Sequence, residues 1–381
     1  MTSLPQIPFN LPTRVATELS YVAQAFESGH TSASGEFAQR AAGIIADDTG
    51  AAEVLMTTSC TSALELSGML MDFQPGETVI VPSFTFSASA LAFAREGARL
   101  IFCDIEPETL GLDPSHVAEL LDDSVRAVVP VHYAGIGARM EALDEVLAHR
   151  PDVAVIEDNA HGLFGTLNGR PLGGLGALAT QSFHETKNFS CGEGGALVIN
   201  DESYVDRARV LYDKGTNRRA FFLGQVDKYS WRDNGSSFGL SDLLAAGLTA
   251  QLEERKAIQG RRQEIFEQYA ALLGPAAGEL GFTIPVVPAG REPAWHMFYL
   301  LLPNSPTRDR LLAELRDNGI QATFHYVPLH SSKGGHRFAA RETDCPVSTD
   351  VSGRLIRLPF HNHLSDGDVE RVADTVLEVL R

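Results

Sequence analysis

The sequence predicts an α/β fold in which helices cover both faces of a mostly parallel sheet. Between residues 51 and 214, short apolar runs alternate with amphipathic stretches, which is the pattern of strand, helix and parallel strand. The stretches between the runs are long enough to hold crossover helices. From about residue 240 the alternation stops, and strands mix with longer helices. We therefore expect a large α/β domain followed by a smaller α+β domain.

Each predicted strand is a short run of apolar and β-branched residues between turn signals. Six or seven can be placed, over residues 54–57, 78–81, 100–103, 127–131, 153–156, 179–183 and 196–199. Helices are predicted where apolar residues recur with a helical period, over residues 62–71, 88–95, 114–121, 139–149 and 204–212. In such a doubly wound sheet, we expect the ligand at the carboxyl ends of the strands.

A long polar segment, residues 214–239, has neither a helical nor a strand period. Loops of this size are usually functional or disordered, and the aromatic residues in this one favour order. A long helix is predicted from residue 240 to about residue 273. The charge run within it, residues 251–256, is interpreted as a solvated helix face.

The rest of the chain is consistent with a separate α+β domain. Strands are predicted over residues 296–302 and 323–327, and helices over residues 307–318 and 366–380. The predicted domains are residues 1–245, which hold an N-terminal segment and the large α/β domain, and residues 246–381, which form the α+β domain.

Composition excludes several classes of protein. The chain has 381 residues, of which 44% are hydrophobic and 21% charged, as in an ordinary globular protein. Its net charge of -18 argues against nucleic acid or an anionic membrane as a partner, so an anionic substrate needs a local basic patch. We see no secretory signal in residues 1–15 and no membrane-spanning run. The 4 cysteines lie far apart without metal-type spacing, which predicts a reducing cytoplasm and no metal site.

The candidate chemistry lies after two predicted strands. Asp158 follows the run at 153–156, and Lys187 follows the strand that ends at Phe183. A lysine can bind a cofactor aldehyde, while a carboxylate keeps a pyridine nitrogen protonated so that the ring accepts electrons. Taken separately, the lysine is a surface charge and the aspartate a turn residue. Together, in this order and with a phosphate-binding loop upstream, they predict a pyridoxal phosphate (PLP) site.

Hydroxyl-bearing residues between the first strand and the first predicted helix, around Cys60 and Thr61, form the candidate phosphate loop. Free N–H groups and the positive end of a helix favour a phosphate there, although a plain N-cap is the alternative. Ser182, at the end of another strand, can add a hydroxyl group. Phe86 can stack on the cofactor ring or pack in the core. His161 can contact the ring or be a buried structural histidine.

Five strings resemble those of the DegT/DnrJ/StrS sugar aminotransferases, in the same order. They are Pro-Ser-Phe-Thr-Phe, Pro-Val-His-Tyr-Ala-Gly, Ile-Glu-Asp-Asn-Ala-His, Ser-Phe-His-Glu-Thr-Lys-Asn and Gly-Glu-Gly-Gly. The resemblance covers nearly the whole chain, from residue 7 to residue 359. It implies PLP fold type I, which is aspartate aminotransferase-like, with a mostly parallel seven-stranded sheet in the large domain. Further strings, such as Phe-His-Tyr-Val-Pro-Leu-His, are similar to members that form dTDP-4-amino-4,6-dideoxygalactose.

The resemblance also implies a role for each matching position. Lys187 is then the catalytic lysine that binds the cofactor, and Asp158 is the partner of the pyridine nitrogen. Phe86 stacks on the ring, and the phosphate contacts come from Ser182, Cys60 and Thr61. His161 stands where many relatives have glutamine, and Ser237 where many have the asparagine that reaches the partner subunit's phosphate. This loop exchange implies a homodimer with shared active sites.

The implied reaction moves an amino group from an amino acid, expected to be L-glutamate, to a nucleotide-linked 4-keto-6-deoxy hexose. Candidate substrate-binding residues are Lys214, Arg218, Tyr229, Arg232 and His330, and the alternative for the charged residues is a solvated loop. Amination at C3 of the sugar remains open, as does a noncatalytic PLP-bound sensor. Dehydration at C3 is disfavoured, because that branch of the family replaces the lysine with histidine.

Overall fold

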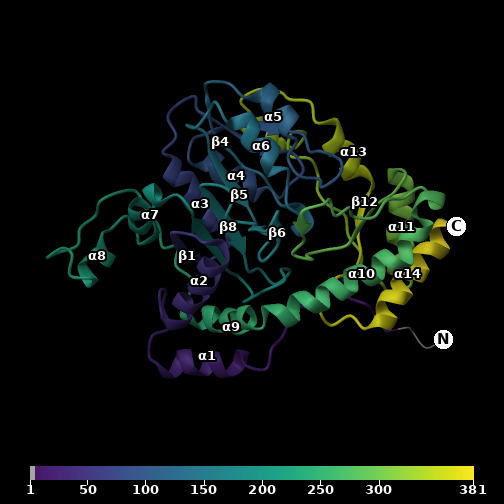
Figure 1. Cartoon of the computed structure of the whole chain (residues 1–381), viewed down its shortest axis with the longest axis horizontal. Coiled ribbons are helices and arrows are strands. Elements are labelled where there is room, and N and C mark those ends of the chain that lie inside the picture. Colours follow the sequence, from purple (N-terminus) through teal and green to yellow (C-terminus); the bar gives the residue numbers. More distant parts are fainter. Residues whose placement is uncertain (1–4) are drawn as a thin grey trace.

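The computed structural model describes residues 5–381 and is built around a seven-stranded sheet (Figure 1). Its strands are β1 (Glu53–Thr57), β2 (Thr78–Pro82), β3 (Arg99–Cys103), β4 (Val125–Val128), β5 (Ala154–Asp158), β8 (Leu178–Ser182) and β9 (Gly195–Ile199). They lie in the order β1-β9-β8-β5-β4-β2-β3, and β9 is antiparallel to both neighbours. The predicted α/β class and mostly parallel seven-stranded sheet are confirmed.

Helices cover both faces of this sheet. Their bounds lie close to the predicted ones: α3 (Cys60–Met71), α4 (Ala88–Arg95), α5 (Pro114–Leu120), α6 (Met140–Leu147) and α7 (Val205–Tyr212). In β2, Val79 and Val81 face the core on the α3 side, while Ile80 faces the core on the α5 side. Because successive strand residues point to opposite faces, a strand buried on both sides reads as a continuous apolar run.

Two N-terminal helices that were not predicted, α1 (Glu18–Glu27) and α2 (Glu36–Thr49), pack on α9 (Asp242–Glu253). Figure 1 shows α1 lying alongside α9. The Asp242 carboxylate accepts a hydrogen bond of 2.8 Å from the N–H of Ala38, at the start of α2. An acceptor at a helix N-terminus satisfies a donor that has no partner within the helix.

The prediction of one long helix over residues 240–273 is wrong. The chain forms α9 and then α10 (Arg255–Leu280), and the helix breaks at Glu254, where φ is -90° and ψ is 16°. The charge run at 251–256 is not wholly solvated either. Gln251 is buried, its amide donates to Thr13 and Glu18, and its carbonyl accepts from the Ser190 N–H. These tertiary contacts override the local charge pattern.

The predicted strand at 323–327 is also wrong, because only Thr323 forms a bridge, with Arg357. The following side chains turn toward aromatic partners instead of a neighbouring strand: the rings of His325 and Tyr326 stack 3.7 Å apart. The polar segment 214–239 contains one short helix that was not predicted, α8 (Arg218–Phe222). Figure 1 shows α8 extending away from the sheet.

The C-terminal part has its own apolar core. Its elements are β11 (Tyr299–Leu301), α11 (Ser305–Asp317), α12 (Lys333–Phe338), α13 (Pro346–Arg354), β12 (Leu355–Arg357) and α14 (Asp366–Leu380). Ser365 and Asp368 form a capping box at the start of α14. The predicted boundary at 245/246 falls within α9, and the division into two domains stays a prediction. Residues 1–4 of the predicted first domain lie outside the described residues.

Smaller elements complete the fold. They are β6 (Thr166–Leu167), β7 (Arg170–Pro171) and β10 (Arg291–Glu292), which form a separate sheet, and the 3-10 turns η1 (Tyr133–Gly135) and η2 (Glu202–Tyr204). Within residues 5–381, every helix is too short or too polar to cross a membrane.

Candidate active site

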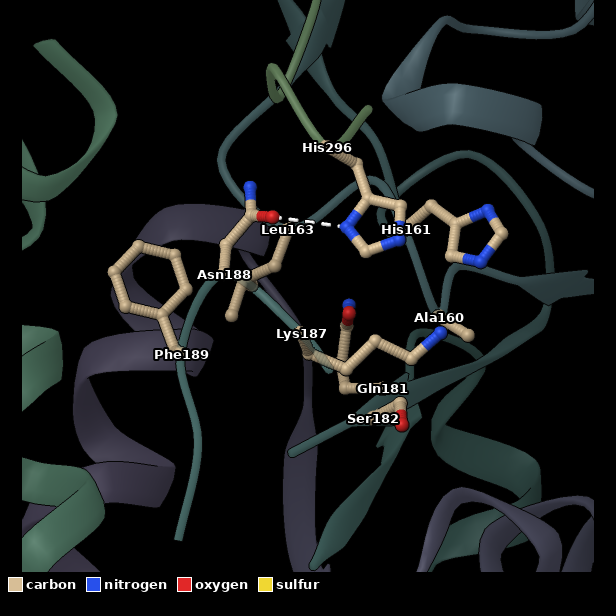
Figure 2. A pocket seen from close by; sticks show the side chains of 9 residues that line it. All are labelled: Ala160, His161, Leu163, Gln181, Ser182, Lys187, Asn188, Phe189 and His296. Carbon is tan, nitrogen blue, oxygen red and sulfur yellow. Dashed lines mark hydrogen bonds between the residues drawn. The ribbon is translucent and has the colours of Figure 1, made fainter. Parts of the chain in front are cut away.

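A pocket lies at the carboxyl ends of β5 and β8, two parallel neighbours in the middle of the sheet. Three of the predicted site residues line it: His161, Ser182 and Lys187 (Figure 2). The other lining residues are Ala160, Leu163, Gln181, Asn188, Phe189 and His296. In Figure 2 the amine of Lys187 points across the pocket toward Ala160. The sheet thus brings together residues that lie far apart in the sequence.

The turn between β8 and β9 holds Lys187. The Cys191 N–H bonds to the Phe183 carbonyl at 3.1 Å, and the Glu185 N–H bonds to the Gly192 carbonyl at 2.9 Å. Gly192 has a φ of +88°, a conformation that glycine adopts without strain. Burial lowers the pKa of the Lys187 amine to about 8, although Asp158 acts in the opposite direction. An amine with this pKa can accept and release protons near neutral pH.

Asp158 is buried at the end of β5 and is held by a chain of hydroxyl groups. Its Oδ2 accepts a hydrogen bond of 2.6 Å from Ser89, whose hydroxyl lies 2.9 Å from that of Thr85. Because Ser89 donates its proton to Asp158, Thr85 must donate to Ser89. The Ala160 N–H, at 3.2 Å, bonds to Oδ1. This network fixes the carboxylate, and the sequence did not indicate Ser89 or Thr85.

The predicted phosphate loop lies at the N-terminus of α3, where Cys60 and Thr61 occupy the first positions. Ser59 is an N-cap that accepts from the Ser62 N–H at 3.0 Å, so the alternative interpretation as a cap also holds. Burial is the main reason that the pKa of the Cys60 thiol rises to about 12. A Cβ added to Gly195 would lie 2.4 Å from the Cys60 nitrogen, which explains why glycine stands at the start of β9.

His161 stacks on His296, with ring centroids 4.2 Å apart and 13° between the planes (Figure 2). Burial lowers the pKa of both rings, so both are neutral. Nδ1 of His161 and both polar atoms of the Gln181 side chain are buried without a hydrogen-bond partner. Buried polar groups are costly unless they form hydrogen bonds, so these atoms are suited to bind a polar ligand. Nδ1 of His296 lies 2.9 Å from Oδ1 of the Asn188 side chain, and this hydrogen bond holds the ring in place.

These groups fit PLP. An amine with a lowered pKa can bind the aldehyde, and a fixed carboxylate can face the ring nitrogen. A helix N-terminus suits the phosphate, and the unpaired His161 nitrogen can bond to a ring oxygen. Within residues 5–381 no cluster of three or more metal-ligating side chains competes with this interpretation.

The other predicted residues lie outside the pocket. Phe86 is 60% exposed, and its ring centroid lies 6.5 Å from that of Tyr326. His330 bonds to the Ser83 hydroxyl at 2.6 Å. Ser237 is exposed and bridges to Asp213.

The candidates in the segment 214–239 are exposed as well. Lys214 lies 3.0 Å from the Asp213 carboxylate, and Arg218 stacks on Phe222 at 5.1 Å. Tyr229 and Arg232 are also on the surface. In the described part of the chain, residues 5–381, none of the four lines the pocket, so their assignment to the substrate stays a prediction.

Comparison with known proteins gives consistent results along nearly the whole chain. The DegT/DnrJ/EryC1/StrS aminotransferase family model matches residues 12–377. The spore coat polysaccharide biosynthesis protein SpsC of Bacillus subtilis (strain 168) is 31% identical over 383 residues, 98% of this chain and 97% of that protein. The dTDP-4-dehydro-2,3,6-trideoxy-D-glucose 4-aminotransferase of Saccharopolyspora spinosa is 31% identical over 329 residues, 84% of this chain and 83% of that enzyme.

A solved structure gives the same result. The crystal structure of the aminotransferase TlmJ from Streptoalloteichus hindustanus matches with a TM-score of 0.90 and 31% identity. The match covers 98% of this chain and 99% of that one.

Proposed function

Because the chain belongs to the DegT/DnrJ/EryC1/StrS aminotransferase family, whose members depend on PLP, we propose that it aminates a nucleotide-linked sugar. The amino donor is L-glutamate, and the acceptor is a 4-keto-6-deoxy hexose. The product is dTDP-4-amino-4,6-dideoxygalactose. The observation that carries the reaction type is the Lys187 amine, which lies in a pocket beside Asp158 with a pKa lowered to about 8.

Lys187 has the central task in this proposal. When bound, PLP supplies an aldehyde for the donor's nitrogen and a protonated ring that accepts electrons. Lys187 would hold the aldehyde through Nζ, and the donor's amine would take its place. Nζ, once free, would take the proton from the α carbon of the donor and pass it to the cofactor. In the second half-reaction it would move a proton from the cofactor to the sugar carbon that receives nitrogen.

The remaining groups orient the cofactor. Asp158, fixed by Ser89, keeps the ring nitrogen protonated, because a neutral ring would be a poor electron acceptor. The N–H groups of Cys60 and Thr61, at the N-terminus of α3, would bind the phosphate together with the Ser182 hydroxyl. His161 would contact a ring oxygen, and Phe86 would cover one face of the ring.

Two features support a nucleotide-sugar substrate. One relative acts, by its name, on a dTDP-linked 4-keto deoxy sugar. The string Phe-His-Tyr-Val-Pro-Leu-His is similar to that of family members that form dTDP-4-amino-4,6-dideoxygalactose. The exposed residues Lys214, Arg218, Tyr229 and Arg232, with His330, bind the nucleotide diphosphate. They act across the interface of a homodimer, in which Ser237 of one subunit reaches the cofactor phosphate of the other.

The test adds substrates in turn while the absorption spectrum of the PLP-loaded protein is followed. L-Glutamate should convert the cofactor to its amine form, and dTDP-4-keto-6-deoxyglucose should then restore the starting spectrum. NMR of the product should place the new amine at C4 in the galactose configuration. An amine at C3 would overturn the assigned position, and binding of either compound without spectral cycling would indicate a sensor.

A further inference from the structure

Arg357, the last residue of β12, is a cation without an anionic partner. Its Nη1 donates a hydrogen bond of 2.7 Å to Nε2 of His325, and Phe9 covers one face of the guanidinium at 4.8 Å. Nε is buried and has no hydrogen-bond partner. Within residues 5–381, no aspartate or glutamate lies within ion-pair distance of Arg357. A guanidinium with a buried, unpaired nitrogen is costly in free energy unless an anion binds to it.

His325 cannot supply the missing negative charge. Since Nη1 of Arg357 always carries hydrogen, Nε2 of His325 must accept. The hydrogen of the neutral ring is then on Nδ1, which lies 3.1 Å from the Tyr133 hydroxyl. Burial, followed by the charge of Arg357, lowers the pKa of His325, so the ring stays neutral. His325 therefore occupies one corner of the guanidinium, and within residues 5–381 the Nε and Nη2 edge has no hydrogen-bond partner.

Arg262 shows how a structural arginine of this protein is satisfied. It is 2% exposed, and its Nε and Nη2 donate to the carbonyls of Trp295 and His296, both at 2.7 Å. Its Nη1 donates to Asn362 at 3.2 Å. All three nitrogens thus have acceptors within the chain. The unpaired edge of Arg357 thus distinguishes it from Arg262.

Arg357 is connected to the pocket through His325 and Tyr133. Its partner His325 bonds to Tyr133, which follows β4, whereas the phosphate loop contacts β9. In the sheet, β5, which ends at Asp158, and β8, which precedes the turn with Lys187, lie between β9 and β4. The Tyr133 ring lies 6.0 Å from the ring of the pocket residue His161, which places His325 and Arg357 next to the pocket. The contacts of Arg357 thus reach the pocket from the β4 side, whereas the candidate phosphate loop lies at β9.

We propose that the free Nε and Nη2 edge of Arg357 binds the α-carboxylate of the amino-acid donor. Two parallel N–H groups match the two oxygens of a carboxylate, and a bidentate pair of this kind fixes orientation as well as affinity. It holds the donor's α carbon within reach of Lys187. This inference rests on the proposed aminotransferase function and adds the group that recognises the donor. The keto sugar has no carboxylate, so Arg357 acts in the first half-reaction.

The experiment compares L-glutamate with 4-aminobutyrate, which is the same amine without the α-carboxylate. Each is added to PLP-loaded protein, and conversion of the cofactor is followed in a single turnover. In Arg357→Gln the apparent affinity for glutamate should fall about 10- to 100-fold, while that for 4-aminobutyrate should change less than about threefold. The second half-reaction, started from protein loaded with pyridoxamine phosphate, should keep its rate within about threefold.

Matched variants separate recognition from folding. Arg357→Lys keeps the charge but not the planar fork, so it should fold and still lose part of the preference for glutamate. Arg262→Lys, an equally conservative change in a neighbouring buried arginine, should leave the ratio of the two affinities unchanged. If Arg357→Gln does not fold, Arg357→Lys decides the question.

Two results would overturn the proposal: an unchanged ratio of the two affinities in both Arg357 variants, or a loss confined to the sugar half-reaction. The last would assign the edge to the nucleotide sugar. If wild-type protein converts no amino acid, the proposed function itself fails, and that outcome is distinct from an unchanged ratio in an active enzyme.

Discussion

At the residue scale, the protonation of Lys187 determines the pH dependence of the reaction. Burial lowers the pKa of its amine from 10.5 to about 8, so the neutral base becomes more abundant as pH rises toward that value. The single-turnover rate with glutamate should therefore rise about tenfold per pH unit below the pKa and level off above it. A stopped-flow pH series checks this. A rate that falls as pH rises from roughly 6 to 8 would contradict the assigned base.

Ser89 provides a second prediction at this scale, because it fixes the Asp158 carboxylate. Ser89→Ala should lower kcat about tenfold, which corresponds to one hydrogen bond to a charged group, and Asp158→Ala should lower it about 100-fold or more. The matched control is Ser67→Ala, since Ser67 is also buried but donates only to the Ala63 carbonyl of its own helix. Equal activity of the two serine variants would show that the Ser89 contact has no part in catalysis.

The sequence predicted Asp158 and Lys187 because each follows a strand, in a local string that can be recognised. It did not predict Ser89, His296 or Arg357. Ser89 is 69 positions from Asp158, and His296 is 108 positions from Asn188, with which it bonds. Such partners are brought together only by strand order and by the C-terminal part of the fold, so no local spacing indicates them.

At the element scale, the close approach of β9 to the N-terminus of α3 shapes the phosphate site. Gly195→Ala would place a Cβ 2.4 Å from the backbone of Ser59 and Cys60, so the strand and the helix must separate. We expect a loss of about 1–3 kcal/mol in unfolding free energy and weaker PLP binding. Urea unfolding and cofactor titration measure the two effects.

Gly43→Ala is the matched control, because Gly43 lies within α2 and a Cβ there meets no atom within 4 Å. It should stabilise the protein by about 0.5–1 kcal/mol and leave PLP binding unchanged. If Gly195→Ala behaves in the same way, the contact between β9 and α3 does not shape the site.

Helices and strands with a clear apolar pattern in the sequence were predictable. Those whose position depends on contacts with elements distant in the sequence were not. The strands of the large sheet are buried on both faces, so their apolar runs stand out. α1 buries only Glu18 and Ala25, and its position depends on α9, which is distant in the sequence. The chain at 323–327 has the composition of a strand, but His325 and Tyr326 pack against other aromatic rings.

At the scale of the whole molecule, the exposed apolar residues around α8 indicate an interface with a second copy of the chain. Phe222 is 68% exposed, Leu223 62% and Trp231 82%. Apolar side chains gathered on a projecting segment are typical of an interface. We predict that light scattering will give twice the 41.2 kDa mass of one chain.

Phe222→Ser combined with Leu223→Ser should weaken the dimer, while Val286→Ser, at a residue that is 46% exposed elsewhere, should not. A monomeric wild-type protein with full activity would contradict the shared active site.

The most direct test of the account is borohydride reduction of the PLP-loaded protein, followed by peptide mapping. Reduction makes the bond between the cofactor and its lysine permanent. The account predicts the adduct on Lys187 and no adduct in Lys187→Ala. An adduct on Lys214, Lys228, Lys256 or Lys333, or no adduct in the wild-type protein, would contradict it.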